Sequence, residues 1–284
     1  MNLFFLKISF LFLLLQTTDC QTNAKLKTTD STTHQVPSEA MHRNIPVSVV
    51  VPTQYKNNAD VPFSVIYLLH GHSGNYQDYL VDYKELQMLS DKHQVIFVCP
   101  DGGYGSWYFD SPIDSNYRYE TFISKELVTW VDSQYRTKAS AENRSIGGLS
   151  MGGHGALYLA IRHPETFGAA GSMSGGLDFR PFAEEWDIKE RLGVYAKNKE
   201  IWAANCVTNM VDKIPANLRL TIDCGTEDFF LSVNRIFHEK LEKRGIKHRY
   251  SEQKGSHDWN YWEKSLPEMI AFLSEKKESA NNKK

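Results

Sequence analysis

Apolar runs of strand length alternate with longer amphipathic segments along most of the chain. The runs are almost continuously apolar, as expected of strands covered on both faces of a mainly parallel sheet. The amphipathic segments have apolar residues at helical spacing, most clearly across 119–135. The pattern therefore predicts an α/β fold in which helices flank a mainly parallel sheet. The expected strands are 47–51, 63–69, 95–99, 143–149, 169–173, 218–223 and 247–253, and the expected helices are 119–135, 155–162, 231–243 and 259–275.

The two ends of the chain depart from this alternation. An apolar run at 8–15 follows a weakly basic start and leads into small polar residues. This order predicts a secretory signal over residues 1–20, too short for a comfortable membrane span, and hence export to the periplasm, outer surface or medium. Residues 21–40 are polar and lack apolar periodicity, so we expect a flexible linker there. One domain over 41–276 and a polar tail over 277–284 complete the expected organisation.

Four cysteines bear on the cellular location and on covalent cross-links. Cys20 occupies the position of the acylated cysteine in a bacterial lipoprotein signal. Asp19 is atypical before such a cysteine, so the sequence favours soluble export and leaves a lipid anchor at Cys20 open. Cys99 lies in an apolar strand and is expected to be a core thiol. Whether Cys206 and Cys224 form a disulfide stays open.

Length and charge limit the number of domains and the class of partner. A chain of 284 residues with 41% hydrophobic and 23% charged residues fits one α/β domain of ordinary size. Its formal net charge of −2 gives no reason to expect nucleic acid or an anionic surface as a partner.

A serine between two glycines, Gly148-x-Ser150-x-Gly152, carries the strongest chemical signal in the chain. A nucleophilic serine must sit on a sharp strand-to-helix turn, which brings the residues two before and two after it close together. The expected strand 143–149 and helix 155–162 supply this context. The sequence therefore predicts a nucleophile elbow with Ser150 as the nucleophile.

A serine nucleophile needs a histidine base, and His257 fits that role best. It lies in a glycine-bearing loop between the last expected strand and the last expected helix. In folds with a nucleophile elbow of this kind, the histidine base follows the acid along the sequence, and both lie on loops after sheet strands. Surface or capping roles are expected for the other histidines after the serine, His154, His163, His238 and His248.

The acid partner is expected in the loop after the strand 218–223. Asp228 is favoured, because a position five residues past the strand can lean toward a histidine on the neighbouring loop. Glu227 and Asp223 are the alternatives. The acid would hold the imidazole in one tautomer and stabilise its cation.

An oxyanion hole requires two backbone N–H groups. Met151, directly after the nucleophile, is expected to supply one. The other is expected from His72, with Gly71 as the second choice. His70 and His72 could also be considered as metal ligands, but no third ligand cluster accompanies them in the sequence, so neither a metal nor a cofactor is expected.

Several separate motifs resemble one esterase family of the α/β-hydrolases. This family includes feruloyl and acetylxylan esterases of carbohydrate esterase family one, tributyrin-type esterases, S-formylglutathione hydrolases and mycolyl transferases. The resemblance covers about residues 45–274 and implies that Ser150, Asp228 and His257 are nucleophile, acid and base. The motifs are Tyr67-Leu68-Leu69-His70-Gly71, Pro100-Asp101-Gly102-Gly103, Gly148-Leu149-Ser150-Met151-Gly152-Gly153, Asp223-Cys224-Gly225-Thr226-Glu227-Asp228, and His257-Asp258-Trp259 with Trp262.

The resemblance implies a serine carboxylic ester hydrolase acting through an acyl-serine. With export, it favours acetyl or feruloyl esters on plant polysaccharide, so the partner would be a small-molecule or oligosaccharide ester. Trp107, Tyr108 and Trp259 are the expected substrate-binding aromatics. The alternatives are an acyltransferase with the same triad and an S-formylglutathione hydrolase-like thioesterase. A binding module without activity is disfavoured, because both the serine and His257 are present.

Overall fold

One eight-stranded sheet forms the centre of residues 31–275, the part of the chain that the computed structural model describes. The strand order is β1-β2-β4-β3-β5-β6-β7-β8. β2 pairs antiparallel with both β1 and β4, and every other neighbouring pair is parallel. The expected mainly parallel sheet is confirmed. The strands are β1 (Ser31–Ser38), β2 (Arg43–Val50), β3 (Ser64–Leu69), β4 (Val95–Pro100), β5 (Arg144–Leu149), β6 (Ala169–Met173), β7 (Arg219–Gly225) and β8 (Arg249–Gln253).

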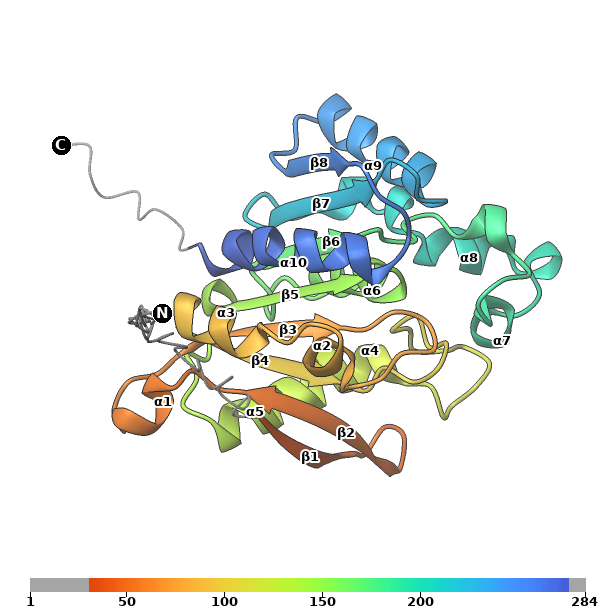
Figure 1. Ribbon diagram of the computed structural model, residues 1–284. Coiled ribbons are helices and arrows are strands. Elements are labelled where there is room, and N and C mark those ends of the chain that lie inside the picture. The colour runs from red at the N-terminus through yellow and green to blue at the C-terminus, as the bar shows by residue number, and fades with distance from the viewer. Residues whose placement is uncertain (1–30, 276–284) are drawn as a thin grey trace, which may run out of the picture.

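Helices cover both faces of this sheet (Figure 1). α3 and α10 pack on one face, and α6 and α9 pack on the other. α7 and α8 lie beyond the carboxyl ends of the strands, at the right of Figure 1. The helices are α1 (Gln54–Asn57), α2 (Asp78–Val81), α3 (Leu86–His93), α4 (Tyr119–Thr121), α5 (Val128–Gln134), α6 (Met151–Arg162), α7 (Ile188–Leu192), α8 (Lys199–Asn205), α9 (Leu231–Lys243) and α10 (Trp259–Ser274).

The predicted helix at 119–135 is one continuous helix in space, but its middle part is π-helical and its two ends are α-helical. A π-helical segment, Phe122–Leu127, joins α4 to α5. β6 and α9 have the predicted bounds, whereas α3 was missed by the sequence analysis.

Residues 31–38 are a strand, which corrects the expectation of a linker over all of 21–40. β1 pairs antiparallel with β2 along its full length, and Val36 is completely buried. The Ser38 hydroxyl also donates a hydrogen bond to Glu126, at 2.6 Å. The other residues of β1 are mostly polar and exposed, as suits an edge strand, and so the sequence showed no apolar periodicity. The expected signal, Cys20 and the tail at 277–284 lie outside the described residues.

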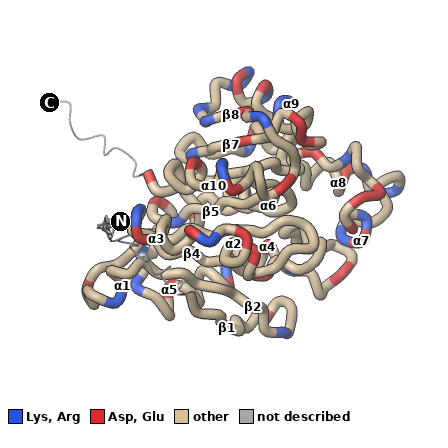
Figure 2. The backbone as a smooth tube through the Cα atoms, in the orientation of Figure 1, with Lys and Arg blue, Asp and Glu red and all other residues tan. Residues whose placement is uncertain are grey.

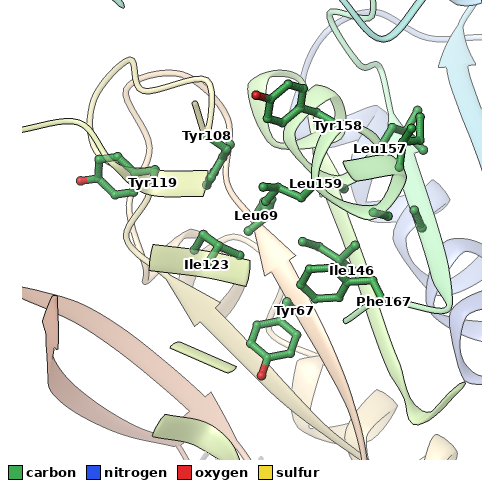
Figure 3. Packing of buried hydrophobic residues seen from close by; sticks show 14 of the residues in the cluster. Tyr67, Leu69, Tyr108, Tyr119, Ile123, Ile146, Leu157, Tyr158, Leu159 and Phe167 are labelled. Carbon is green, nitrogen blue, oxygen red and sulfur yellow. The ribbon is translucent and has the colours of Figure 1, made fainter. Parts of the chain in front are cut away.

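The core lies on both faces of the sheet. On the α6 face, Leu69 of β3, Ile146 of β5 and Leu159 of α6 lie close together (Figure 3). There the Tyr67 and Phe167 rings meet edge to face, with centroids 5.8 Å apart. On the opposite face, Met269 of α10 packs so closely on β6 that a Cβ at Gly171 would lie 2.6 Å from its side chain. The sheet is therefore held between two apolar layers.

Most charged residues lie on helices and loops (Figure 2). β3, β4 and β6 contain none, in keeping with strands buried on both faces. Cys99, Cys206 and Cys224 are all buried free thiols, so Cys206 and Cys224 do not form a disulfide in this structure. Among the described residues, no helix is long and apolar enough to cross a membrane.

Candidate active site

The turn between β5 and α6 brings three backbone segments into close contact. A Cβ on Gly148 would lie 2.5 Å from the carbonyl carbon of Gly152, and a Cβ on Gly152 would lie 2.0 Å from the Leu69 carbonyl oxygen. Only glycine fits at either position. Between them, Ser150 has φ 55° and ψ −118°, a conformation rare for a residue with a side chain. The turn thus has the strained geometry of a nucleophile elbow.

Two hydrogen bonds connect the Ser150 hydroxyl to a buried carboxylate. His257 Nε2 lies 2.8 Å from Ser150 Oγ, and His257 Nδ1 lies 2.8 Å from Asp228 Oδ2. A carboxylate can only accept, so Nδ1 carries the proton and donates to Asp228. The neutral imidazole then presents a lone pair at Nε2, which accepts the hydrogen bond from the serine. This arrangement can remove the hydroxyl proton during an attack by Oγ.

Asp228 is the acidic group that contacts His257, and neither alternative does so. Its side chain is fully buried, and Oδ1 accepts a 2.7 Å hydrogen bond from the Phe230 N–H, which fixes the carboxylate plane. Glu227 is exposed. Asp223 instead accepts a 2.8 Å hydrogen bond from the Ser251 hydroxyl, and burial raises the pKa of its carboxyl group.

Three aromatic rings surround the imidazole of His257. The centroid of Phe229 lies 4.3 Å from it, that of Trp262 lies 5.0 Å away, and that of Phe230 lies 5.4 Å away. Trp262 is itself held by a 3.1 Å hydrogen bond from Nε1 to the Ser174 hydroxyl. These contacts restrict the orientation of the imidazole between the serine and the aspartate.

The expected oxyanion donors lie beside the serine. Met151 is the first residue of α6, where backbone N–H groups have no partner within the helix. A Cβ on Gly71 would lie 3.4 Å from the Ser150 Cβ, and both Gly71 and His72 line the same cleft as the serine. The His72 ring is held by a 2.9 Å contact between Nε2 and Asp187 Oδ2, a partner that no sequence pattern indicated.

His70 has a structural role. Its Nδ1 donates to the Gly71 carbonyl oxygen at 2.7 Å, and its Nε2 accepts from the Gly102 N–H at 2.7 Å. Burial lowers the pKa of the imidazole, in keeping with a neutral ring. Both ring nitrogens are thus engaged within the protein, and neither is free to pair with His72 on a metal ion.

An aromatic cleft of about 440 Å³ opens over Ser150. Trp259 lines it, as the sequence analysis expected. Trp186, Phe229 and Trp262 also line it but were not predicted as substrate-binding residues. Asp78 and Asp82 contribute carboxyl groups to the same cleft.

Trp107 and Tyr108 do not line this cleft, which corrects the expectation that they bind substrate. Their side chains are buried, with exposed fractions of 1% and 0%. Trp107 Nε1 donates to the Trp186 carbonyl oxygen at 3.0 Å, and the Tyr108 hydroxyl donates to that of His70 at 3.0 Å. Both side chains therefore hold backbone segments that border the site and do not face the substrate.

His154 also differs from its expected surface or capping role. It is completely buried in an aromatic cluster, stacked on Tyr158 with ring centroids 5.5 Å apart. Burial lowers the pKa of its imidazole to about 4. It is a neutral core residue on α6, nearly all of whose residues are buried.

The sequence family that matches residues 38–273 bears the description "Putative esterase". The chain belongs to this esterase family. Because the match spans most of the described domain and helices cover both faces of a mainly parallel sheet, the protein is an esterase of the α/β-hydrolase type.

Similar proteins carry several activities in their names. An acetyl esterase of Caldicellulosiruptor saccharolyticus is 26% identical over 84% of this chain and 95% of its own length. A diacylglycerol acyltransferase/mycolyltransferase, Ag85B of Mycolicibacterium smegmatis, is 28% identical over 84% of this chain and 82% of its own length. A solved ferulic acid esterase has the same fold, with a TM-score of 0.74, 23% identity, and coverage of 87% of this chain and 98% of its own.

The acidic residues after β7 allow a direct test of the hydrogen-bond chain. Asp228→Asn should lower kcat for a short-chain ester by about 10⁴-fold, because an amide no longer favours the Nδ1–H tautomer of His257. Glu227→Gln, an adjacent and exposed charge removal, should leave kcat within about twofold. Steady-state kinetics with p-nitrophenyl acetate provides the measurement. A larger loss in Glu227→Gln or Asp223→Asn than in Asp228→Asn would contradict the assignment of the acid.

Proposed function

We propose that the protein is an exported serine esterase that forms an acyl intermediate on Ser150 and releases it to water. The observation that supports this proposal most directly is the pair of 2.8 Å hydrogen bonds that joins Ser150, His257 and Asp228 at the floor of an open cleft. Such a chain makes a serine hydroxyl nucleophilic near neutral pH.

The reaction takes two acyl-transfer steps. Ser150 Oγ attacks the ester carbonyl carbon while His257 Nε2 accepts the hydroxyl proton. The tetrahedral intermediate expels the alcohol, which takes the proton from His257, and the acyl group stays on Oγ. In the second step His257 removes a proton from water as the water attacks the acyl carbon. The bond from that carbon to Oγ then breaks, the acid leaves, and Oγ takes the proton from His257. Overall, one ester and one water give one acid and one alcohol.

The N–H groups of Met151 and His72 would stabilise the oxyanion in both steps, with Gly71 as the alternative to His72. Met151 at the start of α6 and His72 in the loop after β3 both lie next to Ser150, and this placement supports the role. Asp228 would stabilise the imidazolium that forms in each step. Neither step requires a metal or a cofactor.

Acetyl or feruloyl groups on a plant polysaccharide are the proposed substrates. The aromatic lining suits planar acyl groups or sugar faces, and Asp78 and Asp82 disfavour anionic substrates. The names of the acetyl esterase and ferulic acid esterase relatives fit this class. Export to the periplasm, outer surface or medium rests on the apolar run at 8–15 and on the signal predicted over residues 1–20.

Acyl transfer to an alcohol acceptor is the second candidate function. It is favoured by the similarity to the mycolyltransferase, and it would use the same three side chains. The two activities differ only in whether water or an acceptor hydroxyl takes the acyl group from Ser150. A change in product with an acceptor present therefore distinguishes them.

A substrate panel tests the proposed function. Purified protein should release acid from p-nitrophenyl acetate, methyl ferulate and acetylated xylan, with little turnover of p-nitrophenyl octanoate. Ser150→Ala should lower these rates by at least about 10⁴-fold while leaving the circular dichroism spectrum unchanged. Product analysis with and without xylo-oligosaccharide acceptors separates hydrolysis from transfer. Near wild-type turnover by Ser150→Ala would refute the proposal, and a marked preference for octanoate would refute its substrate class.

Trp259 is expected to contribute to recognition of an aromatic acyl group. Trp259→Ala should lower kcat/KM for methyl ferulate about fivefold more than for p-nitrophenyl acetate, because stacking contributes roughly 1 kcal/mol that an acetyl group cannot gain. Trp130→Ala, a half-buried tryptophan of α5 outside the cleft, is the matched control and should affect both substrates equally. An equal effect of Trp259→Ala on both esters would rule out this role.

A further inference from the structure

Two histidines and a glutamate converge where α9 leads into β8, away from the cleft. His238, Glu242 and His248 each present one ligand atom, and these atoms all lie within 4.8 Å of one another. His238 and Glu242 are four residues apart on α9, so they lie on the same helix face. His248 lies just before β8 and its side chain is only 1% exposed. Sequence spacing gave no sign of this group, and both histidines were expected to have surface or capping roles.

The turn after α9 positions His248. Gly245 adopts φ +63°, and the Ile246 N–H donates to the Leu241 carbonyl oxygen at 3.0 Å. This C-terminal cap reverses the chain and returns it against the helix. The Ile246 carbonyl oxygen then lies 2.7 Å from His248 Nδ1. The same short turn therefore places the histidine and fixes its ring.

The hydrogen bonds leave His248 in the tautomer that a metal ion requires. A backbone carbonyl can only accept, so Nδ1 carries the proton and Nε2 of the neutral ring presents a lone pair. His238 Nδ1 lies 2.7 Å from this Nε2 and donates to it. A metal-binding histidine commonly donates its other ring N–H to a backbone carbonyl in the same way, which fixes the tautomer and the ring orientation.

The other two ligands are also suitably placed. The His238 ring stacks on Tyr250, with centroids 4.0 Å apart and an interplanar angle of 2°. Tyr250 is held in turn by a 2.7 Å hydrogen bond to Glu252, whose charge is paired with Arg235. Glu242 Oε1 lies 3.8 Å from His248 Nε2, on a side chain that is 66% exposed. The rings of His238 and His248 are thus fixed by their contacts, whereas the exposed Glu242 side chain can change its rotamer to reach an ion.

We propose that His238, Glu242 and His248 form a Zn²⁺ site. Two imidazole nitrogens and one carboxylate oxygen are a donor set that suits zinc better than calcium or magnesium. In a tetrahedral site the two nitrogens would lie about 3.3 Å apart, which requires only a small opening of the present pair. The proton on His238 Nδ1 moves to its Nε2, both imidazoles stay neutral, and water takes the fourth position.

The bound ion would join two elements that carry the active-site loops. The loop before α9 contains Asp228, and the loop after β8 contains His257. The ion itself lies at the opposite end of β8, about 16 Å along the strand from the catalytic loop. Its expected effect is therefore on stability, since an ion that binds only the folded state raises the melting temperature, while the ester chemistry proceeds without it.

Zinc binding by the tag-free full-length protein tests this site. After dialysis against EDTA and then metal-free buffer, titration against a chromophoric zinc chelator should show one bound equivalent and a raised Tm. His238→Gln and His248→Gln should each weaken binding by at least about 100-fold, and Glu242→Gln by at least about 10-fold. Glu239→Gln, an exposed charge removal on the same helix outside the cluster, is the matched control and should bind as the wild type does.

The location of the ion gives an independent result. In zinc-soaked crystals, an anomalous peak at the zinc edge should lie within bonding distance of His238 Nδ1 and His248 Nε2. If the buried variant His248→Gln fails to fold, His238→Gln and the exposed Glu242→Gln still decide the outcome. Absence of zinc uptake by the wild type, or equal uptake by His238→Gln and wild type, would overturn the proposal.

Discussion

The close approach of the β5–α6 turn to the end of β3 is the constraint on which the site depends. With any Cβ at Gly152, that atom would overlap the Leu69 carbonyl oxygen, and the turn would have to open. Opening the turn would relax Ser150 from its positive φ and move Oγ away from His257. The same contact places Gly71, the second residue past β3, beside the serine. One backbone contact thus positions both the nucleophile and an expected oxyanion donor.

The parallel sheet brings the remaining groups to the same edge. The segments after β3, β5, β7 and β8 all leave the carboxyl ends of parallel strands, at one edge of the sheet. His72, Ser150, Asp228 and His257 therefore lie close together although they are far apart in sequence. The aromatic side chains then set the environment. Phe229, Phe230 and Trp262 hold the base, and Trp186 reaches the cleft from the segment between β6 and β7.

Sequence reasoning succeeded where local constraints are strong. The glycine spacing around Ser150 reflects a steric requirement, and buried parallel strands such as β3 and β4 have nearly unbroken apolar runs. The loops that carry His257 and Asp228 follow from the strand assignments. These features yielded the fold and the residues that the structure brings together at the elbow.

Features set by long-range packing were missed or wrong. An edge strand buries little, so β1 had the composition of a linker. Trp107 and Tyr108 were expected to bind substrate. Their side chains instead point into the core, where backbone carbonyl oxygens accept hydrogen bonds from the Trp107 indole and the Tyr108 hydroxyl. The cleft lining by Trp186 and Phe229, and the cluster of His238, Glu242 and His248, depend on segments that meet only after folding.

Direct observation of an acyl group on Ser150 is the most decisive test of the central claim. Acid quenching within the first turnover of p-nitrophenyl acetate, followed by peptide mass spectrometry, would locate the intermediate. The account predicts one acetyl group on the peptide that contains Ser150, formed by the wild type and absent from His257→Ala. An acetyl group on a different residue, or full turnover by a protein that never becomes acylated at Ser150, would contradict it.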